Sequence, residues 1–316
     1  MTESQGHEPY HTPVMLKESI DWLDIKDGGI YVDATFGGGG HSMAILNRMG
    51  IGGRLFAFDQ DGDAEINACS MRNSDGIPLG DDGRFTFVRS NFRHLKRWMR
   101  YYGIGKIDGL LADLGVSGHH FDTAERGFSL RYDSPLDMRM NRESATTAAD
   151  IVADYSEEQL SDIMRMYGEL RNHRQVASAI MERRRDNPIK TTGQLLEATE
   201  RLFPRERLKK EQTKMFQALR MEVNHETDAL AELLKGAAEC MVAGGRLSII
   251  TYHSIEDRIV KNILKTGNET GRADKDFYGR TKAPFRASAK PLTPSAEELI
   301  SNPRSRSAKL RTAIKI

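Results

Sequence analysis

Short hydrophobic runs alternate with stretches of helical periodicity through the first part of the chain. Four runs have the length and the β-branched or aromatic content of strands, and a loop or helix signal follows each of them. They cover residues 30–33, 54–59, 85–89 and 107–113. Strands that alternate with helices are typical of βαβ units, in which neighbouring strands run parallel. The pattern therefore predicts an α/β fold with a Rossmann-like, mostly parallel sheet.

In the middle of the chain the strand signal almost disappears. Ala, Glu, Arg, Met and Leu recur there at helical spacing, and Pro188 and Pro204 mark turns between helices. We expect an inserted all-helical domain at residues 141–224. It would interrupt a sheet domain made of residues 1–140 and 225–316.

The sheet pattern resumes after this insertion. A helix is expected over residues 226–242, and the fifth strand candidate, residues 246–252, follows Ala243-Gly244-Gly245. Residues 267–307 are rich in Lys, Arg, Pro, Ser and Gly with little periodicity, which predicts a long loop. The alternation of residues 308–316 predicts a terminal strand.

The composition is that of a globular protein, with 39% hydrophobic residues over 316 positions. No run approaches the roughly 18 apolar residues of a membrane span, and the polar segment 1–13 lacks the apolar core of a signal peptide. We therefore expect no membrane association and a cytoplasmic location. Cys69 and Cys240 are too few for a disulfide framework and lack the Cys-x-x-Cys spacing of zinc sites, so we expect reduced, structural thiols.

The net charge of +1 conceals two basic regions. Residues 164–222 hold 14 Lys and Arg against 8 Asp and Glu, and residues 271–316 hold 11 against 4. Positive charge concentrated on parts of a chain is typical of a surface that binds a polyanion. In the first region Arg183, Arg184 and Arg185 are the predicted contacts to nucleic-acid phosphates, and a solvated helix face is the alternative.

Four consecutive glycines, Gly37 to Gly40, stand between the first predicted strand and a helix-compatible sequence. Glycine allows positive φ and lets a ligand approach the backbone, so four in a row predict a ligand-binding turn. Asp59 ends the second predicted strand 20 residues after Gly39. This spacing is expected of a carboxylate that binds ribose hydroxyls.

These features fit both NAD and S-adenosylmethionine, because both ligands place an adenosine ribose at the same point of the fold. The dinucleotide pattern Gly-x-Gly-x-x-Gly/Ala requires a small last residue, whereas this chain has Ser42 or Met43 there. That difference weakens the NAD interpretation. The Gly-Lys-Ser/Thr of a Walker A loop does not follow the glycines, which argues against an ATPase.

Eight segments that occur in a fixed order resemble one known family. They are His11–Val14, Asp33–Ser42, Asp113–Ser117, Glu125–Ser129, Pro135–Met140, Phe216–Arg220, His253–Arg258 and Asn302–Ser307. They closely resemble the ribosomal small subunit methyltransferase H family, the bacterial 16S rRNA cytosine-N4 methyltransferases, over nearly the whole chain. The resemblance implies a class I S-adenosylmethionine-dependent methyltransferase fold with an inserted helical domain. It also implies methylation of the N4 amine of a cytidine in the ribosomal decoding region.

The resemblance further implies roles for individual residues. It assigns to the cofactor site Gly39, Gly40 and His41 at the methionine end, Asp59 at the ribose, Phe92 at the adenosine, and Asp113 and His120. The family usually carries a glutamine at the position of His120. A neutral histidine can donate one hydrogen bond and accept another, so the contact can survive this difference.

Methylation of a cytosine amine requires the delocalised lone pair to point at the methyl group in line with the leaving sulfur, so positioning should dominate. An acceptor for the N4 hydrogens would stabilise the positive charge that develops. Asp113, at the end of the fourth predicted strand, is the leading candidate; a carboxylate that caps the loop or orients the cofactor is the alternative.

Tyr252 and His253 follow the fifth predicted strand and are expected to face the same cleft. There a tyrosine could stack on an extruded base and a histidine could orient the substrate, while a structural histidine is the alternative. Asp257 and Arg258 are expected to form an ion pair at a helix start. No metal site is expected, because His119 and His120 lack partners at the spacing of zinc ligands.

Two other functions stay open from the sequence: another nucleic-acid amino-methyltransferase, and a non-catalytic RNA-binding ribosome-assembly protein that keeps the cofactor pocket. The intact glycine turn, Asp59 and Asp113 favour an enzyme. The expected partner is 16S rRNA or the small ribosomal subunit, as naked rRNA or as an assembled particle. A monomer and a homodimer are both open.

Overall fold

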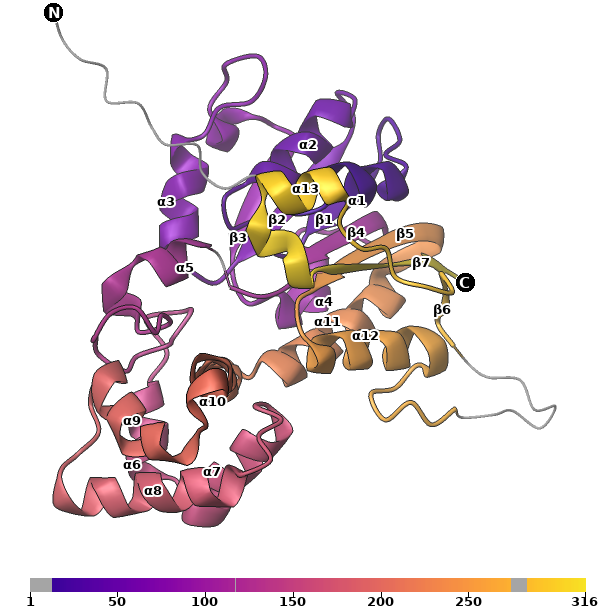
Figure 1. Cartoon of the computed structure of the whole chain (residues 1–316). Helices are drawn as coiled ribbons and strands as arrows, with labels where there is room; N and C mark the ends of the chain where they lie inside the picture. The colour runs from indigo at the N-terminus through magenta and orange to yellow at the C-terminus, as the bar shows by residue number, and fades with distance from the viewer. Residues whose placement is uncertain (1–12, 117, 274–282) are drawn as a thin grey trace, which may run out of the picture. The chain divides into compact units, whose positions relative to one another are not determined.

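The computed structural model describes residues 13–116, 118–273 and 283–316, and Figure 1 shows the path of the chain. Parts of the predicted features lie outside the described residues: His11 and Thr12 of the first family segment, Ser117 of the third, the side chain of His119, and residues 274–282 of the expected loop.

The chain divides into two compact units. One combines Met1–Gly115 with Thr227–Ile316 and contains the sheet; the other is Val116–Glu226 and is helical. Each has a hydrophobic core of its own. The helical unit starts at Val116, ahead of the expected boundary at residue 141, because three side chains from the intervening segment are buried in its core: Phe128, Leu136 and Met138.

Within the described residues, seven strands form a single sheet in the order β3-β2-β1-β4-β5-β7-β6. They are β1 (Ile30–Asp33), β2 (Arg54–Asp59), β3 (Phe85–Arg89), β4 (Ile107–Asp113), β5 (Met241–Thr251), β6 (Phe285–Ala287) and β7 (Lys309–Lys315). The first five run parallel, and β7 pairs antiparallel with both β5 and β6. The predicted α/β fold with a mostly parallel sheet is confirmed.

The hydrophobic runs form strands because both faces of the sheet are covered. Tyr31 and Leu111 are buried in the cluster on one face, and their neighbours Val32 and Leu110 in the cluster on the other. A strand buried on both faces reads as a continuous hydrophobic run, which is why the first four strands could be located from the sequence.

Helices of the sheet unit connect and cover these strands (Figure 1). They are α1 (Leu16–Leu23), α2 (Gly40–Arg48), α3 (Gly62–Ser70), α4 (Leu95–Tyr101), α11 (Glu226–Cys240), α12 (Ser254–Thr266) and α13 (Ala296–Ser301), with the 3-10 turns η1 (Leu79–Asp81), η2 (Phe92–His94) and η6 (Pro303–Ser307). Among the described residues, no helix is both long and apolar enough to cross a membrane.

The fifth strand begins earlier than predicted. It starts at Met241, which pairs with the buried Ile107, and the preceding helix ends at Cys240. Gly244, with a φ of +83°, therefore lies inside the strand, where the pairing with β4 shifts register. Such a shift accommodates an irregular stretch without losing the sheet.

The expectation of one long loop over residues 267–307 is wrong for its described part. Phe285 is buried in the core and begins β6, which pairs with β7. Ser295 then caps α13 by accepting from the N–H of Glu298. These short elements depend on the neighbouring strand β7 and on a cap, so local periodicity did not reveal them.

The helical unit contains α5 (Gly118–Asp122), α6 (Ala148–Asp154), α7 (Glu157–Met166), α8 (His173–Asp186), α9 (Thr192–Thr199) and α10 (Leu208–Val223), with η3 (Ala124–Arg126), η4 (Glu200–Leu202) and η5 (Arg205–Arg207). The helices α6, α7 and α9 start with capping boxes, in which side chain and backbone satisfy each other's hydrogen bonds. The strand-free composition of the middle of the chain is explained by this unit.

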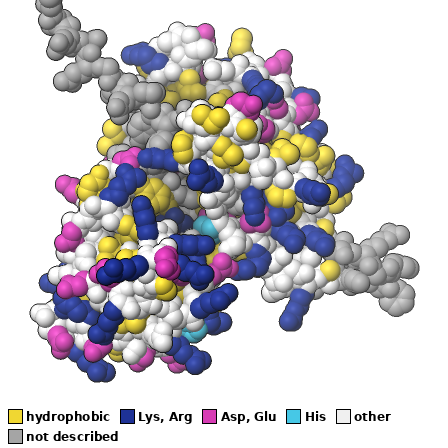
Figure 2. Space-filling view, in the orientation of Figure 1, with side chains coloured by type: hydrophobic (Ala, Val, Ile, Leu, Met, Phe, Trp, Pro, Cys, Tyr) yellow, Lys and Arg dark blue, Asp and Glu magenta, His cyan; other side chains and the backbone are white. Residues whose placement is uncertain are grey.

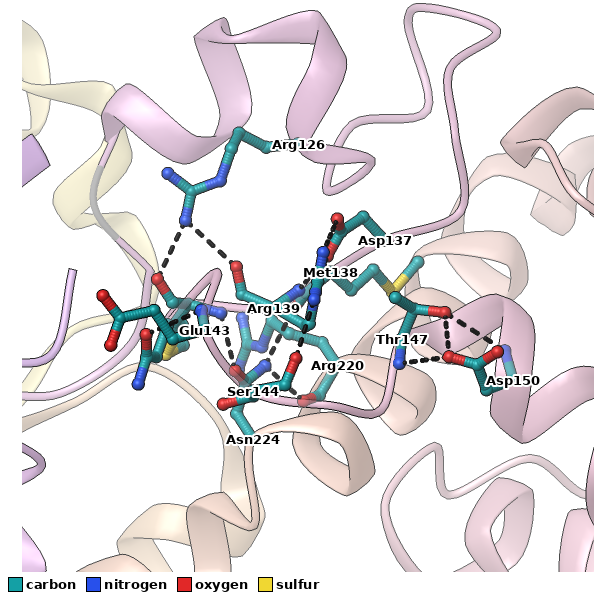
Figure 3. A network of polar contacts seen from close by, with 12 residues as sticks. Arg126, Asp137, Met138, Arg139, Glu143, Ser144, Thr147, Asp150, Arg220 and Asn224 are labelled. Atoms are coloured by element: carbon teal, nitrogen blue, oxygen red, sulfur yellow. Dashed lines mark hydrogen bonds and ion pairs between the residues drawn. The ribbon is translucent and has the colours of Figure 1, made fainter. Parts of the chain in front are cut away.

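A buried arginine organises the segment between η3 and α6 (Figure 3). Arg126 is only 2% exposed and donates to the carbonyls of Arg139 and Met140 at 3.0 Å each. Asp137 accepts from the guanidinium of Arg139, and Asn224, the C-cap residue of α10, donates to the carbonyl of Met138. Residues of two family segments, Glu125–Ser129 and Pro135–Met140, therefore fix one irregular stretch of backbone.

Candidate active site

Polar side chains gather at the carboxyl ends of four neighbouring strands. Asp33 ends β1, Asp59 ends β2, Asp113 ends β4, and Tyr252 follows β5. Because the strand order is β2-β1-β4-β5, these residues lie along one edge of the sheet. Ligands of open parallel sheets bind at this edge. The structure thus brings together the predicted residues Asp59, Asp113 and Tyr252.

The four-glycine turn connects β1 to α2. Gly37 and Gly39 have φ values of +49° and +77°, which residues with side chains rarely adopt. Gly39 is the N-cap residue of α2, and no described side chain caps this helix. A helix start of this kind offers N–H groups to a carboxylate. The geometry suits the predicted placement of Gly39, Gly40 and His41 at the carboxylate-bearing end of the cofactor.

The glycine turn is packed tightly on one side and open on the other. A Cβ on Gly40 would stand 2.1 Å from Cγ of Pro13, and one on Gly39 would stand 2.6 Å from Sδ of Met71. A Cβ on Gly37 would meet no described atom within 4 Å. Gly37 therefore borders the space in front of the turn.

Asp59 is tied to the glycine turn. Its carboxylate accepts from the N–H of Gly37 and from the N–H of Asp61, each over 2.9 Å. A carboxylate oxygen can accept more than one hydrogen bond, as a ribose acceptor must. The predicted ribose acceptor is thus held at the turn by two backbone donors.

The end of β3 is joined to the end of β2 by two amide side chains. Asn91 donates to Oε1 of Gln60 over 3.0 Å and, as the N-cap residue of η2, accepts from the N–H of Arg93. Phe92, the predicted adenosine neighbour, is partly exposed and packs against the core from this turn. Gln60 and Asn91 were not predicted; their only signal is their position one and two residues after the ends of β2 and β3.

Asp113 and Tyr252 form the central polar pair of the site. The hydroxyl of Tyr252 donates to Oδ1 of Asp113 over 2.7 Å, and the N–H of Asp113 donates to Oγ1 of Thr35 over 2.7 Å. Burial raises the pKa of Asp113 to about 7, while the Tyr252 hydroxyl acts in the opposite direction. Burial and the neighbouring Asp113 raise the pKa of Tyr252 well above its usual range, so Tyr252 remains a donor.

Asp33 is a further carboxyl group of the site that the sequence did not single out as functional. It is fully buried, accepts from the hydroxyl of Ser42 over 2.7 Å and from the N–H of Thr35 over 3.1 Å. Burial raises its pKa to about 7. Asp33 links the start of α2 to the end of β1 and thereby fixes both ends of the glycine turn.

His253 makes the contacts of a helix cap, which supports the structural alternative to orienting substrate. It is the N-cap residue of α12, where its Nδ1 accepts from the N–H of Glu256 and its Nε2 lies 3.1 Å from Oε1 of Glu256. The expected ion pair of Asp257 with Arg258 is wrong. Asp257 instead binds Arg311 of β7, with Nε to Oδ1 at 2.6 Å, since side chains one residue apart on a helix point in different directions.

The remaining predicted residues belong to the helical unit. His120 lies on α5, is buried, and packs its ring 5.0 Å from that of Phe128. Arg184 of α8 donates to the carbonyls of Val152 and Tyr155 at the end of α6. It is therefore engaged within the unit.

The other two arginines of the triplet differ in exposure. Arg183 donates to the carbonyl of Asn187 just beyond its own helix, and Arg185 is exposed. On the face seen in Figure 2, Lys and Arg side chains are interspersed with Asp and Glu. Of the triplet, Arg185 is thus the side chain most available to a phosphate.

The residues at the sheet edge fit S-adenosyl-L-methionine: an uncapped helix start at the glycine turn, a ribose acceptor at Asp59, and the partly exposed ring of Phe92. Comparison with known proteins identifies the family. Residues 8–316 match the model of the MraW methylase family. The chain belongs to the MraW methylase family. It is a methyltransferase, and the predicted cofactor, S-adenosyl-L-methionine, is confirmed.

Curated relatives of this MraW-family chain match it over almost its full length. A protein of Bacteroides fragilis (strain YCH46) named Ribosomal RNA small subunit methyltransferase H is 56% identical over 307 residues, 97% of each chain. Proteins of the same name from Phocaeicola vulgatus and Cytophaga hutchinsonii are 54% identical over 313 residues (99% of each chain) and 50% identical over 304 residues (96% of this chain, 99% of the other). The family resemblance predicted from the eight segments is confirmed.

Solved structures are more distant. An rRNA methylase from Streptococcus thermophilus is 13% identical with a TM-score of 0.41, and the alignment covers 95% of both chains. An S-adenosylmethionine-dependent O-methyltransferase from Thermotoga maritima is 11% identical with a TM-score of 0.39, over 99% of this chain and 68% of the other.

Proposed function

We propose that this methyltransferase modifies the N4 amine of a cytidine in the decoding region of 16S rRNA. The observation that carries the proposal is the position of Asp113, a carboxyl group oriented by Tyr252 at the sheet edge that also holds the glycine turn. The small-subunit rRNA is the substrate named for the relatives at 50–56% identity. An exocyclic amine is the group that an oriented carboxylate can recognise and deprotonate.

S-adenosyl-L-methionine, when bound, supplies a methyl group on a positively charged sulfur, which leaves as a neutral thioether. Gly39, Gly40 and His41 would hold its methionine end by their N–H groups, Asp59 its ribose and Phe92 its adenine. The uncapped start of α2, the position of Asp59 at the glycine turn and the partly buried ring of Phe92 support these assignments.

Methyl transfer leaves one positive charge on the substrate, and the loss of a proton removes it. The N4 nitrogen bonds to the methyl carbon as the carbon–sulfur bond breaks, and the nitrogen becomes positively charged. Asp113 then accepts one of its two protons and the product is neutral N4-methylcytidine. A base whose pKa lies near the working pH is suited to this transfer, and the pKa of Asp113 is about 7.

Tyr252 keeps Asp113 in the orientation that this transfer requires. Its hydroxyl occupies Oδ1, which leaves Oδ2 of Asp113 for the amine. The ring of Tyr252 lies against Gly115, where a Cβ would come within 3.1 Å of it. We therefore assign Tyr252 as a positioning residue for Asp113, in place of the stacking role considered from the sequence.

Substrate RNA would bind through phosphate contacts as well as through the base. Of the basic residues considered, Arg185 is exposed and Arg183 partly exposed, and both fit phosphate contacts better than Arg184. Such contacts position RNA without reading its sequence. The proposal places the enzyme in the cytoplasm, where rRNA is assembled into subunits, and a homodimer is a further proposal that sedimentation of the purified protein tests.

Nucleoside mass spectrometry of 16S rRNA from a strain that lacks this gene tests the proposal. Loss of one N4-methylcytidine, restored by the wild-type gene, is the expected result. The variant Asp113→Asn should fail to restore it and should slow single-turnover methyl transfer by about 100-fold or more. Loss of a different methylated nucleoside would support another nucleic-acid amino-methyltransferase, and no loss despite cofactor binding would support a non-catalytic assembly protein.

A further inference from the structure

The side chain of His41 has a defined protonation state. The ring is buried, with 5% of the residue exposed, and its Nε2 lies 3.2 Å from the carbonyl oxygen of Val14. A carbonyl oxygen can only accept, so Nε2 carries the proton. Burial lowers the pKa of His41 to about 4, which keeps the ring neutral at physiological pH. The other nitrogen, Nδ1, therefore presents a lone pair.

This lone pair faces the free oxygen of Asp113. Nδ1 of His41 lies 3.9 Å from Oδ2 of Asp113, which is too long for a hydrogen bond between them. The other carboxylate oxygen, Oδ1, already accepts from the hydroxyl of Tyr252. Among the described residues no donor reaches either Nδ1 or Oδ2. Nδ1 of His41 and Oδ2 of Asp113 are therefore neighbouring acceptors at the sheet edge, and each can accept a hydrogen bond from a ligand.

The chemistry of this pair selects its ligand. A donor that carries two hydrogens on one nitrogen can reach both acceptors at about 2.8–3.0 Å and satisfy them together. A hydroxyl has one hydrogen and satisfies only one acceptor, and a carbonyl oxygen would meet two lone pairs. A primary amine is thus favoured over an oxygen substituent at the same place on a base.

We propose that His41 Nδ1 and Asp113 Oδ2 form a two-acceptor site that holds the target amine by both of its N–H groups. This inference rests on the proposed function and extends it. It gives His41 a role in choosing an amino-bearing base over uracil, in addition to the contact its backbone makes. When Asp113 has taken one proton from the methylated nitrogen, the remaining N–H donates to Nδ1 of His41.

A second layer of the structure holds this acceptor in place. The carbonyl that fixes the His41 ring belongs to Val14, and the next residue, Met15, adopts a left-handed φ of +48°. The N–H of Met15 donates to Oε1 of Glu298 on α13 over 2.7 Å. Val14 and Met15 are also buried against Leu310 of β7. Contacts with the C-terminal part of the chain therefore stabilise the left-handed backbone at Met15. This backbone conformation orients the carbonyl of Val14.

The test compares two isosteric variants on two RNAs. His41→Gln keeps a donor for Val14 and lacks an acceptor at the Nδ1 position, whereas His41→Asn keeps an acceptor there and loses the bond to Val14. Each protein, saturated with S-adenosylhomocysteine to prevent turnover, is titrated with RNA that carries cytidine at the target position. The second RNA carries 2-pyrimidinone riboside, which has the same ring without the amine.

We expect His41→Gln to bind the cytidine RNA about threefold to tenfold more weakly and the pyrimidinone RNA as tightly as wild type does. His41→Asn should retain most of the preference for cytidine RNA. Affinity for S-adenosylhomocysteine, measured by calorimetry, should change by less than about twofold in both variants. Comparable thermal melting temperatures would show that the folded protein is being compared.

Equal weakening for both RNAs would overturn the inference, because a packing role does not depend on the amine. Weakened S-adenosylhomocysteine binding with an unchanged RNA preference would also overturn it, since the pair would then hold the ammonium group of the cofactor. If wild type methylates small-subunit rRNA and His41→Gln keeps the full preference for cytidine, only this inference fails. If wild type transfers no methyl group to that RNA, the proposed function itself fails.

Discussion

The hydroxyl of Tyr252 donates to Oδ1 of Asp113 over 2.7 Å and so joins the carboxyl ends of β5 and β4. The bond orients the carboxylate and stabilises its charged form. It is made by two residues that are far apart in sequence and adjacent only in the sheet. The chemistry of the site can therefore be tested through the tyrosine without changing the acid itself.

Tyr252→Phe should shift the pH dependence of methyl transfer upward. The Tyr252 hydroxyl lowers the pKa of Asp113, so without it that pKa should rise from about 7 by roughly one unit. Asp33, Glu256 and Glu298 raise the pKa of Asp113 in both proteins. The buried His41 is neutral in this range and does not offset the change.

Single-turnover rates between pH 6 and pH 9 check this expectation. The variant should be most impaired at low pH and recover toward wild type as the pH rises. Tyr101→Phe, a change at a tyrosine that is 74% exposed on α4, is the matched control. An unchanged midpoint in Tyr252→Phe would show that the hydroxyl does not act on the titrating group.

Asp59→Ala should weaken cofactor binding. The substitution removes the proposed acceptor of the ribose hydroxyls and also releases the N–H groups of Gly37 and Asp61. Hydrogen bonds to a charged group contribute about 1.5–3 kcal/mol each, so a loss of about 10-fold to 100-fold is expected. Calorimetry with S-adenosylhomocysteine measures this loss of affinity. The affinity of Asp59→Asn, which keeps one acceptor oxygen, should lie between those of wild type and Asp59→Ala. Equal affinity in all three proteins would remove Asp59 from the ribose site.

Substitution of Arg184 should affect stability, whereas substitution of its neighbour Arg185 should affect RNA binding. Arg184→Ala removes two hydrogen bonds to the end of α6, so it should lower the free energy of unfolding by about 1–3 kcal/mol. Arg185→Ala should leave unfolding unchanged and reduce the slope of RNA affinity against salt concentration by about one phosphate contact. Chemical denaturation and RNA titrations at several salt concentrations separate the two effects. The reverse assignment would follow if only Arg184→Ala changed the salt slope.

Asp33→Asn should stabilise the protein most at high pH. The folded-state pKa of Asp33, about 7, lies above its ordinary value of 3.8, so the folded protein keeps a proton that the unfolded chain releases. Stability is therefore lost as the pH rises from about 4 to about 7, and the cost above that range is on the order of a few kcal/mol. The amide of Asp33→Asn does not ionise, so the variant does not lose this stability.

Thermal unfolding at pH 5 and pH 8 checks this sign. The melting temperature of Asp33→Asn minus that of wild type should be larger at pH 8. Asp113 and His41 titrate in both proteins and largely cancel in the difference. A difference that is the same at both pH values would mean that Asp33 is charged in the folded protein throughout.

The first four strands were predictable because burial on both faces imposes a signal that is local to each strand. Residues 30–33, 54–59, 85–89 and 107–113 were located correctly for this reason. The edge strand β6 and the helix α13 have no such signal. Phe285 pairs with Lys315 of β7, and Glu298 accepts from the N–H of Met15, so both depend on residues far away in the sequence.

Site residues were predictable where the ligand requires a particular residue type. They were not predictable where the role of a side chain depends on another residue that contacts it in the folded protein. The glycine turn and Asp59 follow from the demands of a nucleotide-like ligand. The ring of His41 is different, because its acceptor nitrogen depends on the carbonyl of Val14 and on the distance to Asp113. Such contacts arise between elements that the sequence does not show to be adjacent.

The pairing of β4 with β5 bears on the order in which the chain can fold. Asp113 pairs in register with Ile250, and the entire helical unit lies between them in sequence. Closing so long a loop is slow compared with pairing β1, β2 and β3, so the glycine turn and Asp59 should be in place before Tyr252 reaches Asp113. Pulse-labelling hydrogen exchange during refolding should accordingly protect β1 and β2 ahead of β5. A refolding intermediate would then hold a methyl donor before it could accept an amine.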